Sequence, residues 1–168
     1  LTYLKNLAPD AIFFLDCSFQ KFTDVELAPI AALTGLRALD LSSSPSLTGA
    51  SLGQLTTLHE LEWLDFSRTS VVGFPFGIIS NFPSLKFISG HFHEFGDDVL
   101  HQLAGMREIE FVSIKTGPVS ADALRAISGK PSIQGLVLDN AGLTDDTLAA
   151  LRSLPNLLFL DIKKNPFT

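Results

Sequence analysis

The chain has 168 residues, of which 46% are hydrophobic, and it carries a formal net charge of −6 at pH 7. This hydrophobic content is too high for a disordered chain, and the acidic balance opposes nucleic-acid binding, which requires a basic face. No uninterrupted apolar run approaches the roughly 18 residues of a transmembrane helix, so we expect no transmembrane segment.

A pattern of the form L-x-x-L-x-L recurs along the chain at a nearly constant spacing. Seven copies begin 24 or 25 residues apart, at Ile12, Leu36, Leu61, Leu85, Ile109, Ile133 and Leu157. A fixed period in this range predicts a solenoid, in which each unit buries its apolar face against its neighbours. We therefore predict one domain over residues 1–168, with residues 1–11 as the tail of a preceding repeat and residues 12–168 as seven repeats. The absence of an obvious capping segment favours a fragment of a longer chain.

Each copy combines two patterns, counted here from its first residue. Positions 4 and 6 are apolar and alternate with polar residues, as in Leu39-Asp40-Leu41, which predicts a short strand with one buried face. The spacing is too long for hairpins, so the strands should pair in parallel. Residues 23–33, 120–127 and 144–154 predict short helices or 3₁₀ turns, the first with a capping box from Thr23 and Glu26. Residues 72–77 are rich in Pro and Gly and predict irregular turns.

These repeats resemble the leucine-rich repeat family, whose consensus L-x-x-L-x-L-x-x-N-x-L fits all seven units. The resemblance implies an α/β solenoid, a horseshoe with a concave parallel β-sheet and short helices, 3₁₀ turns or irregular returns on the convex side. The family's Asn, which bonds the backbone at the turn, is present only at Asn165. The other units carry Gln20, Ser44, Thr69, His93, Gly117 and Ala141. Because Gly117 and Ala141 cannot bond the backbone, we expect water or a shifted turn there.

On this phase, positions 3, 5, 7 and 8 face the concave surface. Five of the seven residues at position 3 are aromatic, in the series Phe14, Ala38, Trp63, Phe87, Phe111, Gly135, Phe159. Because adjacent strands lie about 4.8 Å apart, Trp63, Phe87 and Phe111 should form a contiguous column, which Phe19 and Phe92 at position 8 extend. Such a strip either anchors a partner or simply packs along the sheet.

Charged residues occupy the neighbouring concave positions. Position 5 carries Asp16, Asp40, Asp65 and Asp161, which either bind a basic partner or a cation or form a solvated face; we favour the solvated face. An open sheet offers little of the desolvation that catalytic carboxylates need. Positions 7 and 8 become basic toward the end of the chain, which indicates a surface that orients a partner. The basic residues are Arg68, Lys115, Lys163 and Lys164.

Other reactive side chains have simpler interpretations. His91 and His93 should share one face of a strand, close to Asp97 and Asp98, and such a group could bind a metal ion. We favour the alternative in which His93 bonds the backbone and the two aspartates begin a helix. Cys17 occupies a buried position and is interpreted as a core hydrophobe. With no phosphate loop, nucleophile elbow or zincin motif, we expect no catalytic residue, metal or cofactor.

We predict a non-enzymatic protein–protein interaction scaffold that binds a protein or peptide on its concave sheet. The predicted partner-binding residues are Trp63, Phe87, Phe111, Asp40, Asp65, Arg68, His91, Phe92 and Lys115. Two alternatives stay open: a substrate-recruiting arm of a larger enzyme such as a ubiquitin ligase, kinase or secreted bacterial effector, or a structural spacer. One cysteine and no N-glycosylation sequon favour an intracellular or bacterial protein. Partner identity and oligomeric state are left open.

Overall fold

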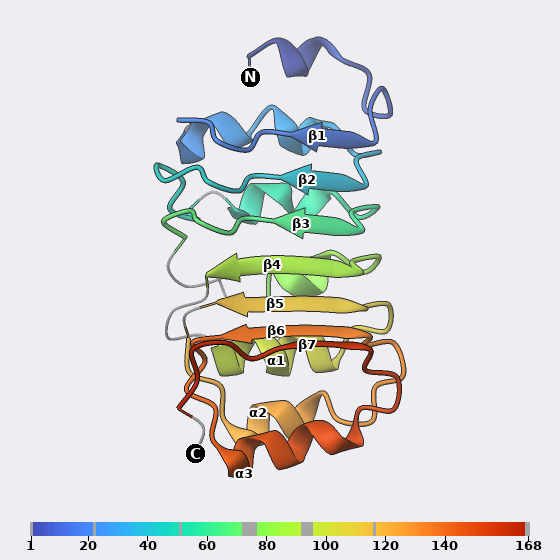
Figure 1. Ribbon diagram of the computed structural model, residues 1–168. Helices are drawn as coiled ribbons and strands as arrows, with labels where there is room; N and C mark the ends of the chain where they lie inside the picture. The colour runs from blue at the N-terminus through green and yellow to red at the C-terminus, as the bar shows by residue number, and fades with distance from the viewer. Residues whose placement is uncertain are drawn as a thin grey trace.

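Seven short strands form a single parallel sheet in which spatial order follows chain order (Figure 1). The computed structural model describes residues 2–21, 23–50, 52–71, 77–91, 96–115 and 117–166. Each strand pairs in register with the next, so equal positions of neighbouring repeats lie side by side. The predicted leucine-rich repeat solenoid is confirmed. The strands are β1 (Phe14–Asp16), β2 (Ala38–Asp40), β3 (Trp63–Asp65), β4 (Phe87–His91), β5 (Phe111–Lys115), β6 (Gly135–Asp139) and β7 (Phe159–Asp161).

Short helical segments follow the strands and lie behind and below them in Figure 1, and one more, at the N-terminus, lies above β1. One face of the sheet therefore meets these returns, and the other, called the open face from here on, points away from them. The 3₁₀ segments are η1 (Thr2–Asn6), η2 (Asp24–Leu27), η3 (Ile30–Ala32), η4 (Leu52–Thr57), η5 (Ile79–Asn81) and η6 (Ala149–Ser153). The α-helices are α1 (Gly96–Ala104), α2 (Ala121–Ala126) and α3 (Asp145–Leu148).

The predicted returns are confirmed where the structure describes them. Residues 23–33 form η2 and η3, and the Glu26 carboxylate accepts a hydrogen bond from the Thr23 N–H at 2.6 Å, as a capping box requires. Of the predicted irregular segment, residues 72–76 lie outside the described residues. None of the helices in the described ranges is long and apolar enough to cross a membrane.

The residue at position 5 decides how long each strand is. In β1, β2, β3 and β7 it is an aspartate, and a carboxylate oxygen accepts the N–H two residues further on, at 2.7–3.2 Å. This local turn competes with the sheet ladder and ends these strands after three residues. Position 5 is Ser89, Ser113 or Val137 in the other three strands, which continue for five residues.

Position 8 lies in the left-handed backbone region in repeats with an aspartate at position 5 and also in the repeat of β6, where position 5 is Val137. Side chains other than glycine adopt this region infrequently. The residues concerned are Phe19, Ser43, Arg68, Asn140 and Lys164, with φ between 53° and 58°. Asparagine tolerates this region well, whereas a bulky aromatic such as Phe19 does not. Recurrence at one position shows that the turn is a property of the repeat.

The core is one continuous stack of apolar side chains between the sheet and the returns. Position 4 of the five inner strands is fully buried, in the series Leu39, Leu64, Ile88, Val112 and Leu136. Position 6 is buried in the same way, with one irregularity between neighbouring repeats. Phe66 is followed by Gly90, and a Cβ built on Gly90 would fall 2.6 Å from Cζ of the Phe66 ring. The large residue therefore fills the space that its small neighbour leaves.

Position 9 carries the ladder of side chains that bonds the turns. Asn165 Oδ1 accepts the N–H groups of Ala141 and Leu143 at 2.9 and 3.0 Å, and its amide donates to the Leu138 and Ile162 carbonyls. Asn165 therefore bonds the backbone of the preceding repeat, and by the same pattern a side chain at position 141 would bond Gly117 and Val119. The Val119 N–H instead donates to the Ala141 carbonyl at 2.9 Å. The expectation of water or a shifted turn at Gly117 and Ala141 stays a prediction. Gln20, Ser44 and Thr69 donate to backbone carbonyls as expected.

Candidate functional site

Four aromatic rings stack along the open face of the sheet and are called the aromatic column from here on. They come from position 3 of β3, β4, β5 and β7, namely Trp63, Phe87, Phe111 and Phe159. Ring centroids lie 4.9 Å apart from Trp63 to Phe87 and 5.2 Å apart from Phe87 to Phe111, with the planes within 16° of parallel. These distances match the strand spacing, so the register of the sheet imposes the stack.

A glycine extends this column past a strand that contributes no ring. Position 3 of β6 is Gly135, and Phe111 and Phe159 stack across it with centroids 5.8 Å apart. A Cβ on Gly135 would lie 2.5 Å from Cε2 of Phe111, so the ring occupies the space above this glycine. The predicted contiguity of Trp63, Phe87 and Phe111 is confirmed. The sequence analysis did not predict that Phe159 joins the column. The signal available was Gly135 at position 3 between two repeats with phenylalanine at that position.

The rings of the aromatic column are neither core nor fully exposed. Trp63, Phe87 and Phe111 are partly buried by one another, and Phe159 is 50% exposed. Stacked rings hide their faces and present their edges to solvent, which fixes their orientation before any partner arrives. Phe19, which we predicted to extend this strip, lies at the turn after β1, where its side chain is 75% exposed. Phe92 lies outside the described residues.

Three carboxylates, called the acidic row, occupy position 5 on the open face of β1, β2 and β3. Asp16, Asp40 and Asp65 are in register on neighbouring strands. Hydrogen bonds from the side chain and backbone of Ser18 hold the pKa of Asp16 below its usual value. Among the described residues, no lysine or arginine forms an ion pair with these three carboxylates. Each aspartate has a structural role at its turn, and the row leaves the N-terminal half of the open face acidic.

The C-terminal end of the open face carries less net positive charge than its number of lysines implies. Lys163 Nζ lies 2.8 Å from Asp161 Oδ2, and Lys164 Nζ lies 3.2 Å from Asp139 Oδ2. The hydrogen bond between Lys163 and Asp161 raises the pKa of the lysine and lowers the pKa of the aspartate. Both lysines are thus matched by carboxylates, and the charge gradient runs from acidic to nearly balanced.

The remaining predicted site residues lie at the carboxyl ends of the strands. His91 and Lys115 are in register at the ends of β4 and β5, where both are partly buried. Arg68 is exposed at the left-handed turn after β3. The structure therefore brings the rings of the aromatic column together as a unit, with His91, Lys115 and Arg68 along one side of it.

Two of the reactive groups take structural roles. Asp97 lies in the first turn of α1, and its Oδ1 accepts the Ser120 N–H at 2.7 Å. His93 lies outside the described ranges, and within them no three His, Cys, Asp or Glu side chains gather as a metal site would require. Cys17 is 3% exposed, and burial raises the pKa of its thiol to about 11, as expected for a core residue rather than a nucleophile.

A ladder of alternating charge runs beside the aromatic column at position 2. Glu62 lies between Arg37 and Lys86, 3.8 Å from the guanidinium and 2.8 Å from the ammonium. The hydrogen bond with Lys86 lowers the pKa of Glu62 and raises the pKa of Lys86. Arg37 also places its Cζ 5.6 Å from the centroid of the Phe13 ring. This arginine therefore lies between an aromatic ring and a carboxylate.

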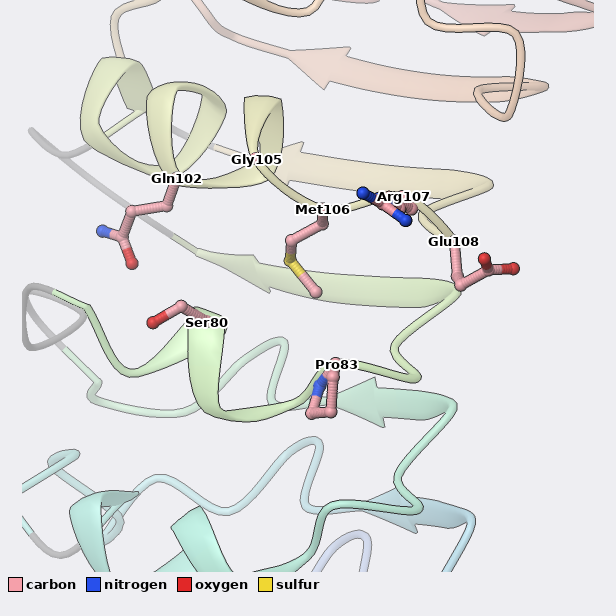
Figure 2. Close-up of a pocket in the computed structure, with 7 residues that line it drawn as sticks. All are labelled: Ser80, Pro83, Gln102, Gly105, Met106, Arg107 and Glu108. Atoms are coloured by element: carbon pink, nitrogen blue, oxygen red, sulfur yellow. The ribbon is translucent and has the colours of Figure 1, made fainter.

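A pocket of about 370 Å³ lies among the returns, away from the aromatic column, where η5 is followed by the longer α1 (Figure 2). Met106, which is 7% exposed, points toward the η5 turn that carries Ser80, and Arg107 and Glu108 lie to one side. The Gly77 N–H donates to Gln102 Oε1 at 3.2 Å nearby. The pocket lies where the three-residue η5 is followed by the nine-residue α1.

Comparison with known proteins shows the fold. No protein-family model and no curated protein matches the chain. Among solved structures, internalin C2 from Listeria monocytogenes superposes with a TM-score of 0.63 at 20% identity, over 95% of this chain and 75% of that one. The plant peptide hormone receptor RGFR1 in complex with RGF2 superposes with a TM-score of 0.58 at 17% identity, over 94% of this chain and 29% of that one. The chain has the leucine-rich repeat fold that these proteins share.

Proposed function

We propose that this chain is a non-enzymatic scaffold that binds a protein or peptide partner on the open face of its sheet. The observation that carries the proposal is the aromatic column, four rings held in one orientation and left partly exposed. Similar folds point the same way, since RGFR1 was solved in complex with RGF2. The proposed contact residues are Trp63, Phe87, Phe111, Asp40, Asp65, Arg68, His91, Phe92 and Lys115. We also propose Phe159, because its ring stacks on Phe111.

Stacking makes the aromatic column a good anchor for physical reasons. Each ring is already ordered by its neighbours, so binding costs little additional side-chain entropy. Aromatic side chains bury large areas and dominate the energetics of many interfaces. The charged residues beside the column would form a rim, which sets orientation more than affinity. A binding surface of this kind needs no cofactor.

The test is a quantitative pull-down from source-cell lysate with the wild-type chain and a variant that carries Trp63→Ser, Phe87→Ser and Phe111→Ser. We expect a protein that the wild type retains and the variant binds about tenfold more weakly, because the hot-spot rings are lost. A matched control carries Tyr3→Ser and Val25→Ser, two residues that are 87% and 81% exposed and lie off the open face. Circular dichroism establishes that each variant is folded.

The possible results separate the proposal from its alternatives. A partner retained equally by the wild type and the triple variant would place binding on the returns, and the proposal would be wrong. If the triple variant fails to fold, the single change Phe87→Ser takes its place, because Trp63 and Phe111 then still flank the position. Retention of nothing by either protein would favour a structural spacer.

A further inference from the structure

We propose that the aromatic column has a vacant place at Ala38, and that an arginine side chain of the partner occupies it between Phe14 and Trp63. The inference rests on the proposed function and names the chemistry by which the open face selects its partner. It follows from the register of β1, β2 and β3, from the exposure of Phe14, and from the acidic row beside these residues.

The register leaves room for one planar group. Phe14, Ala38 and Trp63 occupy position 3 of three successive strands. Two strand spacings separate Phe14 from Trp63, roughly 9.6 Å, which is twice the distance between stacked rings. A planar group above Ala38 would therefore meet both rings at stacking distance. It would continue the series of centroids that are 4.9 and 5.2 Å apart further along the column.

The protein does not close this place with its own side chains. At Gly135 the missing Cβ lets Phe111 lean across and meet Phe159, so that interruption is filled. Ala38 keeps a Cβ, and within the described residues Phe14 stacks on no other ring and stays 59% exposed. The two interruptions of position 3 thus differ: a ring of the chain bridges the one at Gly135, whereas the one at Ala38 carries only a methyl group between the positions of Phe14 and Trp63.

The charges around Ala38 select an arginine over other planar groups. Asp40 lies two residues further along β2, roughly 6.6 Å away by strand geometry, with Asp16 and Asp65 beside it. A guanidinium stacks on aromatic faces and donates paired hydrogen bonds to a carboxylate. A neutral ring would stack without matching the charge, and a lysine ammonium would match the charge without stacking. Two cations lie nearby: Arg37, which pairs with Glu62, and Arg68 at the turn after β3. The three carboxylates of the acidic row outnumber them.

The neighbouring position already shows this arrangement within the chain. Arg37 precedes Ala38, and its guanidinium lies over the Phe13 ring at 5.6 Å and beside Glu62 at 3.8 Å. An arginine between an aromatic ring and a carboxylate is therefore compatible with the local strand spacing. The proposed site repeats the arrangement one residue further along the sheet, with the arginine supplied by the partner.

Trp63 is the only tryptophan of the chain, so its fluorescence reports directly on this place. The probe is the blocked peptide acetyl-Gly-Gly-Arg-Gly-Gly-amide, titrated into the millimolar range at low salt. Two control peptides replace the arginine with citrulline, which is planar but neutral, and with lysine, which is charged but not planar. We expect a saturable change with the arginine peptide and about tenfold weaker binding of both controls.

Two variants locate the response. Ala38→Phe should fill the place with a ring and abolish the response. Asp40→Asn keeps an oxygen for the Ser42 N–H, which Asp40 accepts at 2.8 Å, and should weaken arginine binding about fivefold by removing the charge alone. If Ala38→Phe does not fold, Asp40→Asn decides. Equal responses to arginine and citrulline, an unchanged response in the folded variants, or no response to the arginine peptide would overturn the proposal.

The same variants distinguish failure of the arginine site from failure of the proposed function. A partner captured through the aromatic column is expected to bind Ala38→Phe less well than the wild type. If the triple serine variant loses that partner while Ala38→Phe keeps it, the scaffold stands and the arginine site is wrong. If neither variant loses it, both proposals are wrong.

Discussion

On both faces of this sheet a phenylalanine packs beside a glycine of the next repeat, but the two faces differ in what this packing does. On the core face, Phe66 fills the space beside Gly90, and on the open face, Phe111 fills the space above Gly135. The two arrangements are called the inner pair and the outer pair from here on. Phe66 is fully buried, whereas Phe111 is partly exposed and stacks on Phe159 as well as Phe87.

The difference shows that a phenylalanine of one repeat that fills the space beside a glycine of the next can contribute either to stability or to the shape of the surface. Inside, the ring has core residues on all sides, so its size must match the space that the glycine leaves. Outside, the ring can move toward solvent, so the glycine determines where the ring lies more than whether the repeat folds. The inner pair should therefore resist substitution, while the outer pair should tolerate it and change the surface.

The largest effect is expected for Phe66→Ala in the inner pair. The cavity would have the volume of the lost ring, which includes the space beside Gly90 that the ring fills, and we expect a loss of about 3–5 kcal/mol in the free energy of unfolding. Denaturant unfolding followed by circular dichroism measures it. Phe111→Ala is the matched control, and its loss should be clearly smaller because that ring is already partly exposed. Equal losses would contradict the distinction between the pairs.

A smaller loss is expected for Gly90→Ala. The added methyl would overlap the Phe66 ring, which has no free space into which to move, and overpacking of this kind costs about 1–3 kcal/mol in the free energy of unfolding. The double variant Gly90→Ala with Phe66→Leu should lose less than the two single losses added together, because the smaller side chain makes room for the methyl. Strict additivity of the two losses in denaturant unfolding would show that the residues do not share this space.

The corresponding change in the outer pair, Gly135→Ala, should cost less than about 1 kcal/mol in the free energy of unfolding, because Phe111 can swing toward solvent. The effect should appear in surface geometry instead. With Phe111 displaced, the upfield ring-current shifts of the Phe159 ring protons should be lost from the NMR spectrum, while those of Phe87 change less. Retention of the Phe159 shifts would mean that the stack does not depend on the glycine.

The sequence predicted much of this organisation because it repeats. The strand positions, the parallel pairing and the contiguous rings Trp63, Phe87 and Phe111 all follow from one period. The two pairs could not be predicted in the same way, because they depend on how a residue of one repeat uses the space left by the next. The bond from Asn165 to Ala141 was missed for the same reason. The pocket near Met106 lies between helical segments of unequal length, η5 and α1, and the consensus does not specify these lengths.

The smallest effect is expected at position 6 of the first repeat. This position is Cys17, and the same position is Phe66 in the third repeat and Gly90 in the fourth. Burial raises the pKa of the Cys17 thiol from 9.0 to about 11, so the folded state disfavours the thiolate. The stability contributed by keeping this thiol neutral is complete below the unfolded pKa and is lost as the pH rises through 9 toward 11.

Alkylation by iodoacetamide at pH 8 should therefore be slow in the folded protein and become fast on unfolding. A variant with Cys17→Ala and Phe14→Cys moves the thiol to the open face of β1, where Phe14 is 59% exposed, and should react without unfolding. If both proteins react at the same rate, the core and open faces do not differ in the way that the inner and outer pairs require.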